Sequence, residues 1–453
     1  MSTARSFLPS RITSFVIPKI KALARFMTLQ GTTLLGNLIF GLFCVRLIAP
    51  VDYAKFVVLF GVQGTLAVLM DLNLSGTLVP IIGERIHDRQ LIADYIASMR
   101  VVVRRVYYVV GFGVVFAYPI LVHKQHWSWQ LVAGMVATLL ISTWFIRINS
   151  VYGILLIVLR KRQTWASGQM ISSLSSLLLL GILWKFGWLS AFTAILSNVM
   201  GIVLCAGFYY RQARQSLGVP GVATPAKCKS LIQLALPNVP QSLFYAFQGS
   251  ISLFIITLFG RPTSIASIGA LARLGQLFTL FLQLYPILVE PYFAKLPKER
   301  LKLNYIVGLS VTATFCLAVA LLVSHFSGLF LAILGPGYRG LTFELKLAIS
   351  AAAISSFSAV LWSIHGARRF VYWWSTILGI STTLAVQVCF IARADLSSIR
   401  TVLWLNIATN ITSLAVNACC GVYGFIKGPR EVEDPTPSVQ PPPAAEAAEE
   451  GAF

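Results

Sequence analysis

The chain has 453 residues, of which 57% are hydrophobic and 11% are charged, so we expect a polytopic membrane protein with little sequence left for a soluble domain. Its net charge of +21 would indicate nucleic-acid binding in a soluble protein, but here the basic residues lie mainly between apolar runs, where they set topology and meet anionic lipid. The seven cysteines form no CxxC or Cys/His set. The sequence therefore predicts no nucleic-acid partner, no disulfide framework, no metal site and no cofactor.

The apolar runs predict about twelve transmembrane helices, because roughly 20 apolar residues are needed to cross about 30 Å of hydrocarbon. A basic segment, residues 1–23, precedes the first run, and its mixed composition suits either an amphipathic helix on the membrane surface or a disordered arm. The predicted spans are residues 24–48, 56–80, 102–122, 129–158, 165–185, 189–210, 236–260, 265–290, 303–325, 343–365, 370–392 and 399–426.

A Gly- and Pro-containing linker at residues 212–232 divides the spans into two sets of six. The chain is therefore predicted to be all-α, with an N-terminal lobe at 24–211 and a C-terminal lobe at 233–427 around a central cavity. Because each lobe holds an even number of spans, the two would form a parallel internal repeat. Residues 428–453 are rich in Pro, Ala and Glu and are expected to form a disordered tail.

The basic residues alternate between the two ends of the predicted spans. Clusters around Arg104, Lys161 and Lys227 fall on one side, and sparser residues such as Lys124 and Arg339 fall on the other. The positive-inside rule then places the richer side, with both termini, in the cytoplasm.

Polar residues inside the spans are the candidate functional residues, because they are costly in hydrocarbon and tend to face a cavity or a partner helix. The sequence contains no nucleotide-binding or hydrolase motif, and the five His are scattered, so we do not expect an enzyme. The seventh span carries the clearest one-sided stripe, at three- and four-residue spacing. Its members are Asn238, Gln241, Tyr245, Gln248 and Ser252.

Three further spans carry similar polar stripes. Asn37 lies on the stripe of the first span, Gln276 follows Arg273 on the eighth, and the last span carries Asn406, Asn410, Ser413 and Asn417. Four such spans at the beginning or end of the two lobes favour a central water-filled cavity between the lobes. The alternative is hydrogen bonding between helices in a tight bundle.

Two arginines lie within predicted spans. Arg273 is about nine residues from the outer end of its span, roughly 13 Å along a helix, so its side chain reaches the interface with difficulty. It would contact a ligand or, alternatively, form an ion pair with a carboxylate such as Asp71. Arg147 lies nearer the cytoplasmic end of its span, so it would either contact a ligand or extend to the interface. Asp71 and Glu290 could couple transport to an ion gradient, or could pair with an Arg or cap a helix end.

Four motifs, in order along residues 40–370, carry a resemblance to a known family. The first is the run from Cys44 to Pro80, with matching residues at Arg46, Leu47, Pro50, Asp52, Tyr53, Asp71, Leu72 and Leu74. The others are ALPNVPQSL, the run ASIGALARLGQLFTLFLQLYPILVEPYFAKL, and GPGYRG around Tyr338. Together they resemble polysaccharide flippases of the Wzx type, within the multidrug/oligosaccharidyl-lipid/polysaccharide exporter superfamily. Ala54 and Asn73 depart from the pattern at turn positions where Gly is usual.

The resemblance implies a flippase of the bacterial inner membrane that moves polyprenyl-pyrophosphate-linked oligosaccharide to the outer leaflet by alternating access, for cell-surface polysaccharides such as lipopolysaccharide or exopolysaccharide. Its partners would be that glycan lipid, membrane lipid and other glycan-assembly proteins, including a polymerase. A pyrophosphate would be bound by Arg, and sugar hydroxyls by Asn, Gln, Ser and Tyr. Two alternatives remain: a cation-coupled multidrug exporter of the same superfamily and a membrane glycan polymerase. The short predicted outer loops count against the polymerase.

Overall fold

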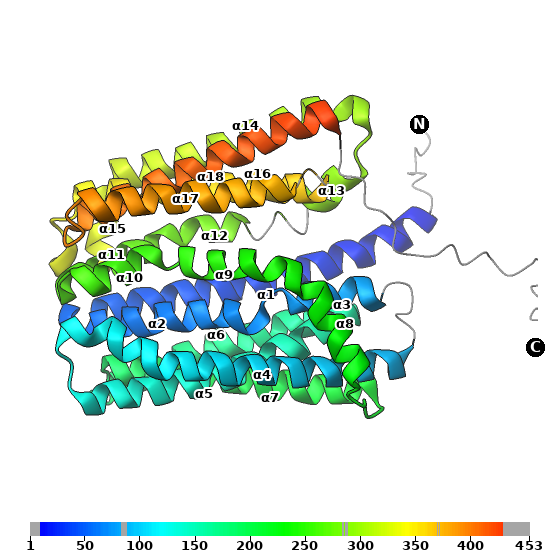
Figure 1. Ribbon diagram of the computed structural model, residues 1–453, viewed down its shortest axis with the longest axis horizontal. Coiled ribbons are helices and arrows are strands. Elements are labelled where there is room, and N and C mark those ends of the chain that lie inside the picture. The colour runs from blue at the N-terminus through cyan, green and yellow to red at the C-terminus, as the bar shows by residue number, and fades with distance from the viewer. Residues whose placement is uncertain are drawn as a thin grey trace, which may run out of the picture.

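The computed structural model describes residues 10–82, 88–282, 285, 289–368, 370 and 372–428. The described chain is all-α, and most of its long helices run side by side along the length of the molecule, with the second half of the chain lying over the first (Figure 1). The prediction of an all-α polytopic protein in two lobes is confirmed.

The first lobe is built from seven α-helices and a short 3₁₀ turn. Its second helix begins with a proline in the first turn, where the missing N–H costs nothing, and ends where Leu72 and Asn73 adopt positive φ angles of 39° and 62°. Asn tolerates this left-handed conformation better than most residues, so the turn forms without the usual glycine. The helices are α1 (Ser10–Leu47), α2 (Pro50–Asp71), α3 (Leu74–Ile82), α4 (Arg89–Val122), α5 (Trp129–Val158), α6 (Arg162–Lys185) and α7 (Ala191–Leu217), with η1 (His123–Gln125) after α4.

The second lobe contains more broken helices than the first. Its elements are α8 (Pro225–Ala235), η2 (Leu236–Asn238), α9 (Val239–Gln248), α10 (Ile251–Phe259), α11 (Pro262–Gly275), α12 (Leu277–Leu282), α13 (Glu290–Lys295), α14 (Lys298–His325), α15 (Ser327–Leu334), η4 (Pro336–Tyr338), α16 (Thr342–Ala367), α17 (Trp373–Arg393) and α18 (Ile399–Lys427).

Ten described helices are long and apolar enough to cross a membrane, or eleven if one bent pair counts as a span. That pair is the predicted seventh span, where α8–α9 meets α10 at an angle of 51° around Gly249 and Ser250. The predicted eighth span, residues 265–290, is instead divided among α11, α12 and the start of α13, and part of it lies outside the described residues. Gly275 at the end of α11 and Pro291 in the first turn of α13 are poor residues for a helix interior.

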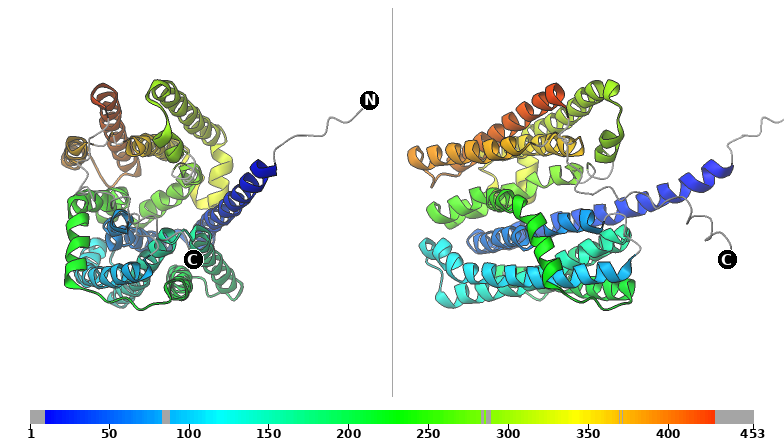
Figure 2. Two further views of the ribbon diagram at one scale, coloured as in Figure 1. Left: turned by 90° about the vertical axis from the view of Figure 1, so that its right-hand side faces the viewer. Right: turned by 45° about the vertical axis from the view of Figure 1, so that its right-hand side comes forward.

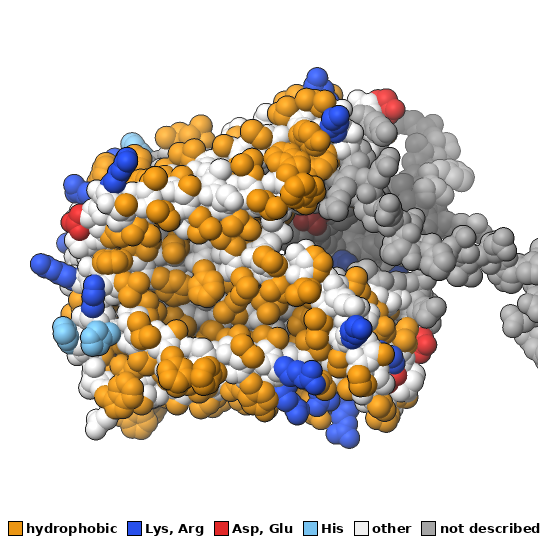
Figure 3. Space-filling model, viewed as in Figure 1, with side chains coloured by type: hydrophobic (Ala, Val, Ile, Leu, Met, Phe, Trp, Pro, Cys, Tyr) orange, Lys and Arg blue, Asp and Glu red, His pale blue; other side chains and the backbone are white. Residues whose placement is uncertain are grey.

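The two lobes meet where α2 packs against α11. Gly269 of α11 permits this close approach, because a Cβ atom there would lie 2.3 Å from a methyl carbon of Val57. On the face shown in Figure 3, apolar side chains cover the middle, while Lys and Arg lie toward the two ends, as a membrane environment requires.

The basic N-terminal segment is helical from Ser10, and the helix continues without a break into the first span, projecting beyond the bundle (Figure 2). The predicted central linker contains the end of α7 and most of α8. It is held to the first lobe because Lys227 forms an ion pair of 2.6 Å with Asp94, whose other oxygen accepts a hydrogen bond from the Val222 N–H at 2.8 Å. The predicted tail lies outside the described residues, apart from Gly428.

Candidate functional site

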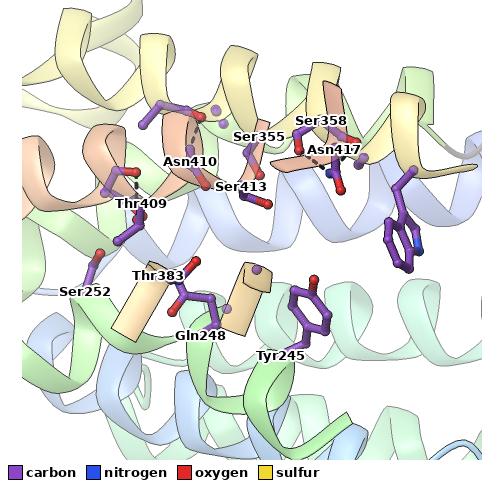
Figure 4. Close-up of a pocket in the computed structure, with 18 of the residues that line it drawn as sticks. Tyr245, Gln248, Ser252, Ser355, Ser358, Thr383, Thr409, Asn410, Ser413 and Asn417 are labelled. Atoms are coloured by element: carbon purple, nitrogen blue, oxygen red, sulfur yellow. Dashed lines mark hydrogen bonds between the residues drawn. The ribbon is translucent and has the colours of Figure 1, made fainter. Parts of the chain in front are cut away.

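The larger of two described pockets is a cavity of about 680 Å³ inside the second lobe. Its lining residues come from α9–α10, α11–α12, α16–α17 and α18, and Figure 4 labels several of the polar ones. Its polar lining residues are Gln241, Tyr245, Gln248, Ser252, Gln276, Thr279, Ser355, Ser358, Ser375, Thr376, Thr383, Asn406, Thr409, Asn410, Ser413 and Asn417.

The lining of this cavity is polar but uncharged. Amides and hydroxyls alternate with small residues, and Phe244, Tyr245 and Trp362 add aromatic surface. None of the described residues that line it is Asp, Glu, Lys or Arg. Such a surface can donate and accept many hydrogen bonds and stack against flat apolar faces, but it offers no fixed charge to an ion.

Helical periodicity explains why these side chains converge. On α9 the residues Gln241, Tyr245 and Gln248 recur at spacings of four and three, and therefore share one face. Figure 4 shows Tyr245, Gln248 and Ser252 on one side of the cavity, across from Ser355, Ser413 and Asn417.

Hydrogen bonds fix several of the amides. Asn410 donates to the Ala351 carbonyl at 3.1 Å, and Asn417 donates to the Ser358 hydroxyl at 2.9 Å, so α18 is bound to α16 along its polar face. Gln387 of α17 donates to the side-chain carbonyl of Gln248. Hydrogen bonding between helices, the alternative to a cavity, therefore accounts for some of the polar side chains in these stripes. The same stripes also line open space.

The structure brings together five of the residues that the sequence singled out on the seventh and eighth spans: Gln241, Tyr245, Gln248, Ser252 and Gln276. Asn238 lies in η2, exposed and outside the lining. Asn37 of α1 is exposed but also outside it. The described cavity is thus lined by the second lobe alone, whereas the sequence predicted contributions from both lobes.

Arg273 lies at the contact between the lobes and not in the cavity lining. Its side chain is 6% exposed, and its guanidinium carbon is 4.4 Å from the ring centre of Phe60 on α2. Its aliphatic part lies against Gly41 of α1. No ion pair joins it to a described carboxylate, Asp71 included. The positive charge is therefore held by aromatic faces rather than by an anion.

Arg147 belongs to α5 in the first lobe and lines the second pocket. That pocket has a volume of about 390 Å³ and is lined by α4, α5 and α7. Arg147 is 7% exposed and its guanidinium carbon is 3.7 Å from the ring centre of Trp144. The two arginines that the sequence singled out therefore lie in different places, and no described pocket is lined by both.

The two candidate coupling acids are hydrogen-bonded to serines. Asp71 accepts from the Ser75 hydroxyl at 2.8 Å and from the Ser150 hydroxyl of α5 at 3.0 Å, where α2 ends. Glu290 accepts from the Ser363 hydroxyl of α16 at 2.6 Å. Neither acid lines a described pocket.

Sequence reasoning missed the contributions of α16 and α17. Ser355, Ser358 and Trp362 recur at spacings of three and four on α16, which is the signal that could have identified them. Ser375, Thr376 and Thr383 of α17 are more weakly patterned, and only the three-dimensional packing places them in the lining.

Comparison with known proteins gives a match in fold. No protein-family model and no curated protein matches the sequence. An inward-facing multidrug resistance MATE family transporter of the MOP superfamily aligns with a TM-score of 0.63 at 14% identity, covering 87% of this chain and 94% of the other. The lipid II flippase MurJ, in an inward closed conformation, aligns with a TM-score of 0.64 at 13% identity, covering 89% of each chain.

A third similar structure is a MOP superfamily transporter from Pyrococcus furiosus, described as having a binding pocket of reversed polarity. It aligns with a TM-score of 0.51 at 14% identity, covering 89% of this chain and 93% of the other. These structural relatives are transporters and flippases rather than enzymes. The chain is a multi-pass membrane protein with the two-lobed fold of the MOP superfamily transporters.

Proposed function

We propose that the protein is a flippase that moves a polyprenyl-pyrophosphate-linked oligosaccharide from the inner to the outer leaflet of a bacterial inner membrane, for the synthesis of a cell-surface polysaccharide. The observation that carries this proposal is the uncharged polar lining of the cavity in the second lobe. An oligosaccharide presents hydroxyls to amides and apolar ring faces to aromatic side chains, and this lining supplies both kinds of partner.

The glycan would contact the α9–α12 face of the cavity through Gln241, Tyr245, Gln248 and Gln276. Asn238, at the start of α9, would extend this surface. The lipid tail would stay in the bilayer, so the protein needs to enclose only the head group.

The pyrophosphate would be bound by Arg273. This side chain follows Ala272 and precedes Gln276 by one turn, and both of these neighbours line the cavity. It is buried between the lobes, against α1 and α2, without a described carboxylate partner. Movement of one lobe relative to the other, as alternating access requires, would expose the guanidinium to a pyrophosphate. Asn37 lies one helical turn from Gly41 on the same face of α1, so it would then lie beside the bound pyrophosphate.

Ion coupling would require an acid that can change its protonation state or bind a cation. Asp71 and Glu290 are the candidates. Asp71 of α2 is joined to α3 and α5 by the Ser75 and Ser150 hydroxyls, and Glu290 of α13 is joined to α16 by the Ser363 hydroxyl. Both termini would lie in the cytoplasm, and glycan-assembly proteins, including a polymerase, would act on the product.

A cation-coupled multidrug exporter is the second candidate, because MATE transporters are among the similar structures. An organic cation buried in a low-dielectric cavity needs a nearby carboxylate. The described lining contains none. This observation favours the glycan lipid over a cationic drug, and the transporters among the similar structures disfavour a polymerase.

Cells that lack their own flippase would test the proposal. Expression of this protein should restore surface polysaccharide, and the variant Gln276→Leu should restore less, because a sugar hydroxyl would lose its partner. Resistance to cationic drugs without restored polysaccharide, when the cognate glycan pathway is supplied, would favour the exporter.

A further inference from the structure

The pocket of about 390 Å³ in the first lobe contains three arginines. Arg100 and Arg104 come from α4 and Arg147 comes from α5, and aromatic rings from α5 and α7 complete the walls. It shares no lining residue with the larger cavity. A concentration of positive charge on apolar helices is costly, so it indicates an anionic ligand.

No ion pair among the described residues balances the charges of these arginines. The described ion pairs involve Asp52, Asp94 and Glu344, and none of them reaches the pocket. Arg147 is more than nine-tenths buried, and its Nε–H has no hydrogen-bond partner in the described structure. A buried guanidinium with an unused donor is expected to bind an acceptor from outside the protein.

Exposed apolar side chains continue along the helices that line the pocket. Along α4 the positions of Arg100 and Arg104 continue at four-residue spacing through Tyr108, Phe112 and Phe116, each of which is more than half exposed. On α7, Leu204 and Met200 are exposed and precede the lining residue Gly207, so they lie toward the other end of the bundle. A ligand in this pocket would therefore have apolar protein surface beside it, where acyl chains can lie.

The depth of the pocket suits a lipid phosphate. Arg104 lies about 27 Å along α4 from its end at Val122, and Arg147 lies about 27 Å along α5 from its start at Trp129. Trp129 is exposed and marks the opposite interface. Because the hydrocarbon layer is about 30 Å thick, the arginines reach the level of the head groups on their own side.

We infer that this pocket binds the phosphate of an anionic phospholipid, with its head group between α4, α5 and α7. The pocket is lined by Arg, aromatic and aliphatic side chains, and its only hydroxyl groups are those of tyrosines. That set suits a compact phosphate head group and gives an oligosaccharide few partners. The site is separate from the proposed glycan cavity and does not depend on which substrate that cavity carries.

A binding titration of the full chain, purified in a neutral detergent, tests this inference. Phosphatidylglycerol and phosphatidylcholine of the same acyl chains would be titrated in parallel and counted by native mass spectrometry. The wild-type protein should retain phosphatidylglycerol at least about tenfold more tightly than phosphatidylcholine. Arg104→Gln and Arg147→Gln should each weaken phosphatidylglycerol binding by about tenfold, the loss of one charge-assisted contact.

Arg105→Gln is the matched control, because Arg105 is an exposed neighbour on the same helix that does not line the pocket. It should bind phosphatidylglycerol like the wild type. Arg104 is itself exposed, so its variant decides the outcome even if the Arg147 variant fails to accumulate. Equal affinity in all variants, or equal binding of the two lipids, would overturn the inference.

Two competitors separate a phospholipid from other sources of phosphate. Inorganic phosphate at millimolar concentration should not displace phosphatidylglycerol, since it lacks acyl chains. Undecaprenyl pyrophosphate should displace it no better than an equal concentration of phosphatidylglycerol. Displacement by inorganic phosphate would make this a soluble-anion site, and preferential displacement by the pyrophosphate lipid would make it a substrate site; either result would overturn the phospholipid assignment.

Discussion

Gly41 of α1 leaves the space that the side chain of Arg273 occupies. A Cβ atom at Gly41 would lie 2.8 Å from Cδ and 3.0 Å from Nε of Arg273. The two residues belong to different lobes, so this contact joins the lobes where the proposed alternating-access mechanism would move one against the other. The ring faces of Phe56 and Phe60 lie 5.7 and 4.4 Å from the guanidinium carbon, and the Tyr53 hydroxyl also lies beside the charge.

A larger side chain at position 41 should displace Arg273. We expect Gly41→Val to reduce glycan export at least severalfold while the protein still accumulates in the membrane, because the arginine side chain can bend away. Gly31→Val on the same helix is the control, since no atom outside its own helix backbone lies within 4 Å of a Cβ there. Export by cells carrying each variant is the measurement. Equal export by both variants would show that the position of Arg273 does not matter.

Replacement of Arg273 itself should remove export. Arg273→Ala would lose one charge-assisted contact, on the order of 1.5–3 kcal/mol or about tenfold or more in affinity for the pyrophosphate. Arg273→Lys should recover part of the activity, because a lysine keeps the charge but not the planar fork. Export and membrane abundance would be measured together.

The same series tests the earlier alternative of an ion pair with Asp71. Asp71 binds Ser75 and Ser150 rather than Arg273. The double variant Arg273→Ala, Asp71→Asn should therefore accumulate no better than Arg273→Ala alone. Recovery of protein in the double variant would indicate a structural charge pair in another conformation.

The cavity predicts a pattern of chemical accessibility along α9. In a cysteine-depleted background, Cys at Gln241, Tyr245 or Gln248 should react with a charged, water-soluble thiol reagent, because these positions line open space. Cys at Leu243 should react much more slowly, because Leu243 is exposed outside the cavity lining and we expect it to face lipid. Labelling rates in membranes are the measurement, and equal rates at 241 and 243 would argue against a water-filled cavity.

Topology follows from the alternation of basic residues. Reporter fusions at Lys161 and Lys227 should be active only on the cytoplasmic side, and fusions at Lys124 and Arg339 only on the outer side. Lys161 donates a hydrogen bond to the Ser216 hydroxyl near the end of α7 at 2.8 Å, and Lys227 belongs to α8, the next helix along the chain. A tail reporter active on the outer side would invert the proposed orientation.

Most of the fold could be predicted from the sequence because apolar length is a strong signal. The run at residues 129–158 became one helix with the predicted ends. The predicted span 56–80 is instead divided between α2 and α3, and α4 begins at Arg89 rather than at residue 102. The predicted eighth span failed as a continuous helix because hydropathy does not register a break at Gly275. The departure at Asn73 had no effect on the turn, since Asn also adopts positive φ.

The candidate site was less predictable. The α9 stripe converged on a cavity as expected, because a shared helical face is a local property. The separation of Arg273 from Arg147 is a property of how the helices pack, and no spacing along the chain encodes it. For the same reason, the sequence did not reveal that Arg147 and Arg104 line one pocket.

Transport by the purified protein in liposomes is the most direct test of the proposed function. A fluorescent polyprenyl-pyrophosphate oligosaccharide would be placed in the outer leaflet, and its movement would be followed with a membrane-impermeant quencher, with and without an ion gradient. Our account predicts flipping by the wild-type protein and its loss in Arg273→Ala, with Arg105→Gln unaffected. Absence of flipping by the wild type under every gradient, together with uptake of an organic cation by the same liposomes, would contradict the account.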